Sequence, residues 1–177
     1  MPFTIAVDSV RRSPLIWPIN IQIRKAGLVD APIVAEFNLL LAEETEQLHL
    51  DPATVNSGVI AILGDDAKGI YHVAVVEGHV VGQVMITYEW SDWRNGNIWW
   101  IQSVYVKKEF RRHGIFRALF KYLEQLARAR PDVCGIRLYM HEANSRARQS
   151  YENLGMALTH YEIFEMDFSA ERRSGKG

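Results

Sequence analysis

The chain has 177 residues, of which 48% are hydrophobic and 23% charged; this composition is typical of one compact globular domain and excludes a disordered or fibrous chain. Its formal net charge is -1, so it lacks the overall positive field that attracts the phosphates of nucleic acids or an anionic membrane. We therefore expect a small or locally recognised partner, with no nucleic acid and no membrane.

The N-terminal segment and the single cysteine exclude further classes of protein. Residues 1–18 show no charged region followed by an apolar run, so we expect an N-terminal arm and not a signal peptide. No stretch approaches the roughly 20 apolar residues that a membrane helix needs, which favours a cytoplasmic protein. Cys134 is the only cysteine and has no activating base beside it, so we expect a small core residue.

The predicted domain begins with one strand and two helices. Alternating isoleucines predict a half-buried strand over residues 19–23. Asp30 is a candidate N-cap for a helix that continues to Leu50. Asp51, followed by a proline, is a candidate N-cap for a second helix that ends at Gly64. A helical hairpin is therefore expected after the first strand.

The rest of the chain alternates between strand and helix patterns. The expected elements are strands at 71–76, 80–90 and 97–106, a helix at 114–130, a strand at 136–140, a helix at 144–154 and a strand at 157–168. The order βααβββαβαβ predicts an α/β (α+β) fold with a mixed, mostly antiparallel central sheet flanked by helices. We expect one domain over 19–168, followed by a polar tail at 169–177.

Residues 104–116 combine a strand end, a basic loop and a helix start. Arg111 and Arg112 precede Gly114, at a helix N-terminus whose unpaired N–H groups attract anions. The same pattern is also compatible with a solvated basic turn. The segment resembles the signature loop of the GCN5-related N-acetyltransferases (GNAT), in which Arg/Gln-x-x-Gly-x-Gly/Ala binds the pyrophosphate of coenzyme A. Phe116 departs from this pattern, and its ring should crowd the phosphate or turn into the core.

A second motif, at residues 144–156, resembles the other half of the GNAT cofactor site. It has Asn144 at a helix start and Tyr151 four residues before Gly155. From the residues alone, Asn144 could be only a helix cap and Tyr151 only a core aromatic. The resemblance implies that Asn144 contacts the cofactor arm. It also implies that Tyr151 is the general acid that protonates the departing thiolate of coenzyme A.

The two motifs together imply an acyl-CoA N-acyltransferase fold, with strands that splay apart at the cofactor site and acetyl-CoA as co-substrate. The residues that the resemblance assigns to acetyl-CoA are Val104, Tyr105, Val106, Arg111, Arg112, His113, Gly114, Ile115, Phe116, Asn144 and Arg148. It also implies that a backbone N–H near Val104 stabilises the oxyanion of the reacting thioester. No metal site is expected.

The acceptor amine is protonated at neutral pH, so a base or a chain of waters must take its proton. Gln102 stands where the related diamine acetyltransferases have a glutamate, and a neutral amide cannot accept that proton. Glu43, Glu44 and Glu89 are candidate bases or ammonium anchors, and Trp90 belongs to an aromatic cluster that could contact a cation. The carboxylates could equally be solvated, and the aromatic residues could lie in the core or in a subunit interface.

These observations predict an N-acetyltransferase that transfers an acetyl group to the primary amine of a small polyamine-like or amino-acid-like molecule by direct attack. A homodimer is expected. One alternative is an acetyltransferase that acts on a protein lysine or N-terminus. The other is a non-catalytic acyl-CoA-binding or interaction module, which Phe116 and the missing glutamate at Gln102 would favour.

Overall fold

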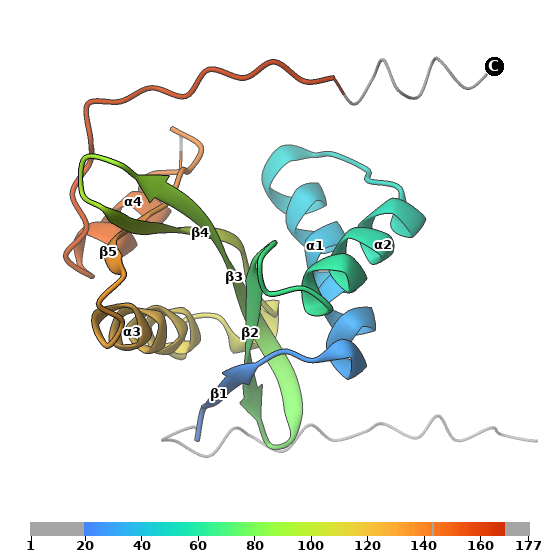
Figure 1. Cartoon of the computed structure of the whole chain (residues 1–177). Coiled ribbons are helices and arrows are strands. Elements are labelled where there is room, and N and C mark those ends of the chain that lie inside the picture. The colour runs from blue at the N-terminus through green and yellow to red at the C-terminus, as the bar shows by residue number, and fades with distance from the viewer. Residues whose placement is uncertain (1–19, 143, 169–177) are drawn as a thin grey trace, which may run out of the picture. The chain divides into compact units, whose positions relative to one another are not determined.

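The computed structural model describes residues 20–142 and 144–168, which form two compact units (Figure 1). The first unit ends at Tyr139 and the second begins at Met140. The expected arm at 1–18 and tail at 169–177 lie outside the described residues, and the expected single domain over 19–168 stays a prediction. None of the described helices is long and apolar enough to cross a membrane.

A five-stranded sheet forms the centre of the first unit. In spatial order its strands are β1 (Gln22–Lys25), β2 (Ile70–Val76), β3 (His79–Ser91), β4 (Gly96–Val106) and β5 (Val133–Arg137). Each strand pairs antiparallel with the next, except that β4 and β5 are parallel. This mixed, mostly antiparallel sheet confirms the predicted fold class.

Helices cover both faces of the sheet (Figure 1). They are α1 (Ala31–Glu46) and α2 (Pro52–Leu63) on one face and α3 (Ile115–Arg128) on the other, with short 3-10 helices η1 (Leu28–Asp30) and η2 (Lys108–Phe110) before α1 and α3. Successive residues of a strand point to opposite faces, so neighbours in β2 have different surroundings. Tyr71 faces α1 and α2, whereas the buried His72 lies edge-on to Tyr122 of α3, with ring centroids 5.3 Å apart.

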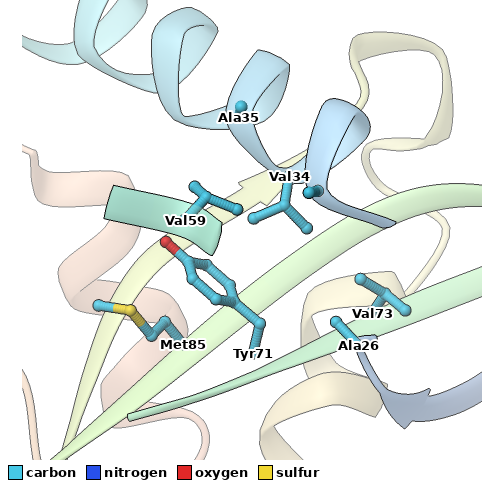
Figure 2. Close-up of a cluster of buried hydrophobic side chains, with 8 residues drawn as sticks. Ala26, Val34, Ala35, Val59, Tyr71, Val73 and Met85 are labelled. Carbon is cyan, nitrogen blue, oxygen red and sulfur yellow. The ribbon is translucent and has the colours of Figure 1, made fainter. Parts of the chain in front are cut away.

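The core under α1 and α2 is made of small and β-branched side chains around one tyrosine. Figure 2 shows Val34 of α1 and Val59 of α2 above Tyr71 of β2, with Met85 of β3 beside it. Val34 and Val59 are at most 2% exposed. Burial of an aliphatic side chain stabilises a fold by about 1.5–3 kcal/mol, so this cluster holds the helical hairpin on the sheet.

The predicted caps are confirmed at α2, whereas at α1 only the position of the cap is confirmed. The Asp51 carboxylate accepts a hydrogen bond from the N–H of Thr54 at 2.9 Å, and α2 is followed by Gly64 as expected. Asp30 occupies the N-cap position of α1, but its side chain makes no capping hydrogen bond to that helix. Its buried carboxylate instead accepts from the guanidinium of Arg24 at 2.7 and 2.8 Å and from the N–H of Gly27 at 2.9 Å, which satisfy both of its oxygens.

Two other predictions in the first unit are also corrected. The strand expected at 136–140 spans 133–137, because its extent is set by pairing with β4. Cys134 was expected in the core but is exposed. It lies in the second position of β5, near the end of the sheet, where its Sγ donates to the carbonyl oxygen of Asn97 at 3.4 Å.

The second unit contains one helix, α4 (Ser145–Glu152), within its described residues. Asn144 caps it, as its place at the predicted helix start indicated, since its side chain accepts from the N–H of Ala147 at 3.0 Å. Gly155, beyond the helix, adopts a left-handed conformation with φ +88°. The strand predicted at 157–168 is absent from this described segment. Alternating hydrophobicity indicates only that a strand could form, and a strand also requires a backbone partner.

Candidate functional site

Strands β4 and β5 part before β4 ends. Their pairing runs from Asn97 opposite Val133 to Trp100 opposite Arg137, whereas β4 continues to Val106. No described strand covers this edge of β4 over residues 101–106, so its backbone groups, apart from the Val106 carbonyl oxygen that accepts from Arg111, are open to another hydrogen-bonding chain. The predicted splay is therefore confirmed, and the open edge suits the amide-containing pantetheine arm of coenzyme A.

The open part of β4 contains a β-bulge. Gln83 pairs with Tyr105 and Met85 with Gln102, so Ser103 and Val104 lie opposite a single residue of β3. Ser103 has φ +49°, a left-handed conformation that non-glycine residues rarely adopt. The bulge interrupts the ladder next to Val104, near which a backbone N–H was predicted to stabilise the oxyanion.

A buried polar chain supports the bulge, and the sequence reading missed it. The Gln83 side chain is fully buried, and its Nε2 donates to the Ser103 carbonyl oxygen at 3.3 Å and to Oδ1 of Asn38 at 2.7 Å. The Nδ2 of Asn38 donates in turn to the hydroxyl of Tyr71 at 2.8 Å. The only sequence signal was an amide inside the apolar run of β3.

The loop after β4 leads into the N-terminus of α3. Gly114 is the N-cap with φ +79°, and a Cβ added there would meet no atom within 4 Å. Phe116, which departs from the family pattern, is half-buried and lies 6.3 Å from the ring of Phe120 along the same helix. The space beside Gly114 is therefore open to a phosphate, and the first N–H groups of α3 are available to bind it.

Other predicted residues of this loop differ in exposure. Arg112 is exposed with φ +66°, and His113 is half-buried. Ile115 is buried, and a Cβ at Gly82 of β3 would lie only 3.2 Å from it, so the helix start is packed tightly against the sheet. This packing fixes the position of the turn that was predicted to bind an anion.

Arg111 points toward α1 and not into the open space before α3. Its Nη2 donates to Oε2 of Glu44 at 2.7 Å and its Nε to the carbonyl oxygen of Val106 at 2.8 Å. Oε1 of the same carboxylate accepts from the hydroxyl of Tyr105 at 3.1 Å, and Lys108 lies 3.4 Å away. Arg111 and Glu44 therefore tie the basic loop to α1.

These contacts shift the pKa values of Glu44 and Tyr105. Burial alone would raise the pKa of Glu44, but Arg111, Tyr105 and Lys108 together hold that pKa below its usual value. Burial and the Glu44 carboxylate raise the pKa of Tyr105 to about 12. Glu44 is therefore a weak base that is already bound by cations, and Glu43 is exposed on the same helix.

Two other residues that were predicted to lie near the acceptor amine, Glu89 and Gln102, are on the face of the sheet that also carries Gln83 and Met85. Glu89 accepts from Nε1 of Trp100 at 2.5 Å and from Nη1 of Arg137 at 2.9 Å. Gln102 donates to the hydroxyl of Thr87 at 2.8 Å. The structure thus brings Glu89 and Gln102 to one surface beside the end of the β4–β5 pairing. Trp90, 59% exposed, follows Glu89 and points to the other face.

The second unit carries the remaining predicted residues on or next to α4. Arg148 and Tyr151 are half-buried, and Asn144 caps the helix. Burial raises the pKa of Tyr151. Its phenol therefore keeps its proton at neutral pH, as a general acid must.

Comparison with known proteins agrees with this geometry. The model of the acetyltransferase (GNAT) family matches residues 35–156. The crystal structure of a possible acetyltransferase from Clostridium difficile 630 is 48% identical, with a TM-score of 0.79 over 83% of this chain and 97% of that chain. A search of curated proteins found no match.

More distant structures share the fold. The ribosomal-protein-alanine N-acetyltransferase from Brucella melitensis biovar Abortus 2308 is 21% identical, with a TM-score of 0.67 over 84% of this chain and 100% of that chain. AAC(6')-Iy, solved with the bisubstrate analogue CoA-S-monomethyl-acetylneamine, is 15% identical, with a TM-score of 0.67 over 84% and 98% of the two chains. On the strength of its family match and its 48% identical relative, this chain belongs to the acetyltransferase (GNAT) family and is an acetyl-CoA-dependent N-acetyltransferase.

Proposed function

We propose that this enzyme transfers the acetyl group of acetyl-CoA directly to the primary amine of a small molecule. The observation that carries the proposal is the parting of β4 from β5 after Trp100, with the Ser103 bulge on the open edge. Half-buried polar side chains, among them Thr87 and Gln102, lie on the adjoining sheet face, where they can contact a molecule of a few atoms.

The first unit supplies the binding and orientation of the donor. Acetyl-CoA, when bound, supplies a thioester whose carbonyl carbon the amine attacks. The main chain of Val104 and Val106 pairs with its pantetheine arm, and the turn around Gly114 at the start of α3 holds its pyrophosphate. The N–H near Val104 stabilises the oxyanion, an effect worth about 3 kcal/mol for one well-placed donor.

Two proton transfers complete the reaction. Tyr151 gives its proton to the departing thiolate. The amine loses its proton to water, because Gln102 is a neutral amide and the carboxylates of Glu44 and Glu89 are each paired with an arginine. The transfer forms one C–N bond and breaks one C–S bond, and needs no further co-reactant.

Steady-state acetylation of small amines and of peptides, followed by thiol release, tests this function. Small primary amines should show a higher kcat/KM than peptides with a free N-terminus or lysine. Turnover of the peptides alone would identify a protein acetyltransferase. The absence of turnover on any amine, together with a thermal shift by acetyl-CoA, would identify a cofactor-binding protein that does not catalyse this transfer.

We also propose that the enzyme is cytoplasmic and works as a homodimer. Trp90 and Trp93, at 59% and 87% exposure near the turn between β3 and β4, provide apolar surface for a subunit contact. Sedimentation velocity at micromolar concentration tests the dimer. A monomer at all concentrations would contradict it.

A further inference from the structure

Arg137 lies where the two parallel strands separate. It is the last residue of β5 that pairs with β4, opposite Trp100, and the open edge of β4 begins immediately beyond this pair. Its side chain is 29% exposed, so the guanidinium is partly removed from water but still reachable from outside. No motif of the sequence pointed to this residue.

The guanidinium of Arg137 is held in a fixed position. Its Nη1 donates to both carboxylate oxygens of Glu89, at 2.9 and 3.3 Å, and Nε1 of Trp100 donates to the same carboxylate at 2.5 Å. The guanidinium carbon lies 5.9 Å from the centre of the Trp100 ring, within cation–π range. An arginine side chain that is ordered in this way loses little further entropy when it binds a ligand.

Only one of the three guanidinium nitrogens is used by this pair. No acceptor in the described part of the chain pairs with Nε or Nη2 of Arg137. These two nitrogens form one edge of the planar group and can donate two parallel hydrogen bonds to a carboxylate. A half-buried arginine that is fixed by Nη1 and presents this whole edge is a built anion site.

We propose, on the basis of the small-amine function above, that the Nε–Nη2 edge of Arg137 binds a carboxylate of the acceptor. The acceptor is then an amine that also carries a carboxylate, of the amino acid class, and not a polyamine. A polyamine would place a second ammonium at the Nε–Nη2 edge of Arg137, which presents N–H donors and no acceptor for an ammonium group.

The dimensions of the site agree with an acceptor of this class. Trp100 and Ser103 are three residues apart on β4, or about 10 Å along the strand. Arg137 is opposite Trp100, and its guanidinium bonds to Glu89, which pairs with Ile98 on the side of Trp100 away from the bulge. The acceptor must therefore span about this distance, so its reacting amine and its carboxylate are separated by several bonds. The ring of Tyr139 lies 6.2 Å from that of Trp100 and provides aromatic surface beside the guanidinium of Arg137.

Paired substrates test the carboxylate requirement in the unmodified enzyme. Common amino acids, β-alanine and γ-aminobutyrate are each compared with their own carboxamide, and putrescine serves as the polyamine. We expect a kcat/KM for the best acid that exceeds that for its amide by about tenfold or more, mainly through KM. Arg137→Gln should reduce this ratio to about two or less while acetylation of the amide continues, and Arg137→Lys should restore part of it.

Arg130 provides a matched control. Its guanidinium lies 5.9 Å from the ring of Trp99 and pairs with Asp132, but on an exposed part of the surface. Arg130→Gln should leave the acid-to-amide ratio unchanged. Equal rates for acids and amides in the unmodified enzyme, or a ratio that survives Arg137→Gln, would overturn the proposal and leave the small-amine function intact. A lack of turnover on every amine would overturn both.

Discussion

The Nε2 of Gln83 donates a hydrogen bond to the carbonyl oxygen of Ser103 at 3.3 Å, so a fully buried amide in β3 holds the bulge in β4. Gln83→Met removes this donor and leaves the Asn38 Oδ1 and Ser103 carbonyl oxygens without it. We expect a loss of about 1–3 kcal/mol in the free energy of unfolding and a fall in kcat of about tenfold. Urea denaturation and steady-state kinetics measure the two effects.

A second substitution separates the effect on the bulge from the effect on overall stability. Glycine adopts the φ of +49° at Ser103 without strain, so Ser103→Gly should restore part of kcat in the Gln83→Met background. The same substitution is made in the unmodified enzyme as a comparison. If Ser103→Gly changes kcat by the same factor in both proteins, the side-chain amide of Gln83 does not act through the bulge.

Gly114→Leu tests the pyrophosphate site. A side chain at this position meets no protein atom nearby and would project into the space before α3. We expect the Kd of acetyl-CoA, measured by calorimetry, to rise by about tenfold or more. The substitution should also destabilise the fold by about 1–2 kcal/mol, because the φ of +79° disfavours residues other than glycine.

Gly78 is the matched control for that prediction. It has φ +80° in the turn between β2 and β3, and a Cβ there also meets no atom within 4 Å. Gly78→Leu should therefore cost similar stability and leave the Kd of acetyl-CoA unchanged. Equal affinities in the two variants would remove Gly114 from the cofactor site.

Tyr151→Phe tests the general acid. Burial raises the pKa of Tyr151, so its phenol is protonated throughout the neutral range, and its contribution should be lost only as the pH rises above that raised pKa. We expect kcat to fall by about a hundredfold at neutral pH with little change in the Kd of acetyl-CoA. Unchanged turnover would leave Tyr151 with a packing role only.

His72 should make the fold sensitive to mild acid. Burial, followed by the nearby charge of Lys25, lowers its pKa from 6.5 to about 4 in the folded state. The unfolded chain therefore takes up a proton first as the pH falls. The contribution of His72 to the free energy of unfolding is fully present above pH 6.5, and the free energy of unfolding should decrease by about 3 kcal/mol as the pH approaches 4.

Urea denaturation between pH 4.5 and 7.5 measures this dependence on pH. His72→Phe keeps a ring against Tyr122 and should flatten the part of the curve that belongs to His72. His79→Gln, on the exposed start of β3, should leave the curve unchanged. A curve with the same slope in His72→Phe and the unmodified protein would assign the acid sensitivity to other groups.

Features that depend on a few neighbouring residues were predictable from the sequence. Asp51 caps α2, Asn144 caps α4 and Gly114 begins α3, because each signal acts within about four residues of itself. Periodic hydrophobicity likewise predicted the three central strands. The order of the elements predicted the mixed sheet, and the resemblance carried by the two motifs implied the splayed strands. The predicted donor half of the site rests on local signals of this kind.

Features that depend on distant partners were decided only by the tertiary structure. Arg111 pairs with Glu44, 67 positions away, and Arg137 with Glu89, 48 positions away, so spacing could not reveal either pair. The register of β4 placed Ser103 in a bulge over Gln83, and the loss of pairing after Trp100 ended β5 at Arg137. Sequence determined which elements form, because their signals are local; only folding decided which side chains meet, because contacts between strands and helices join residues far apart in the chain.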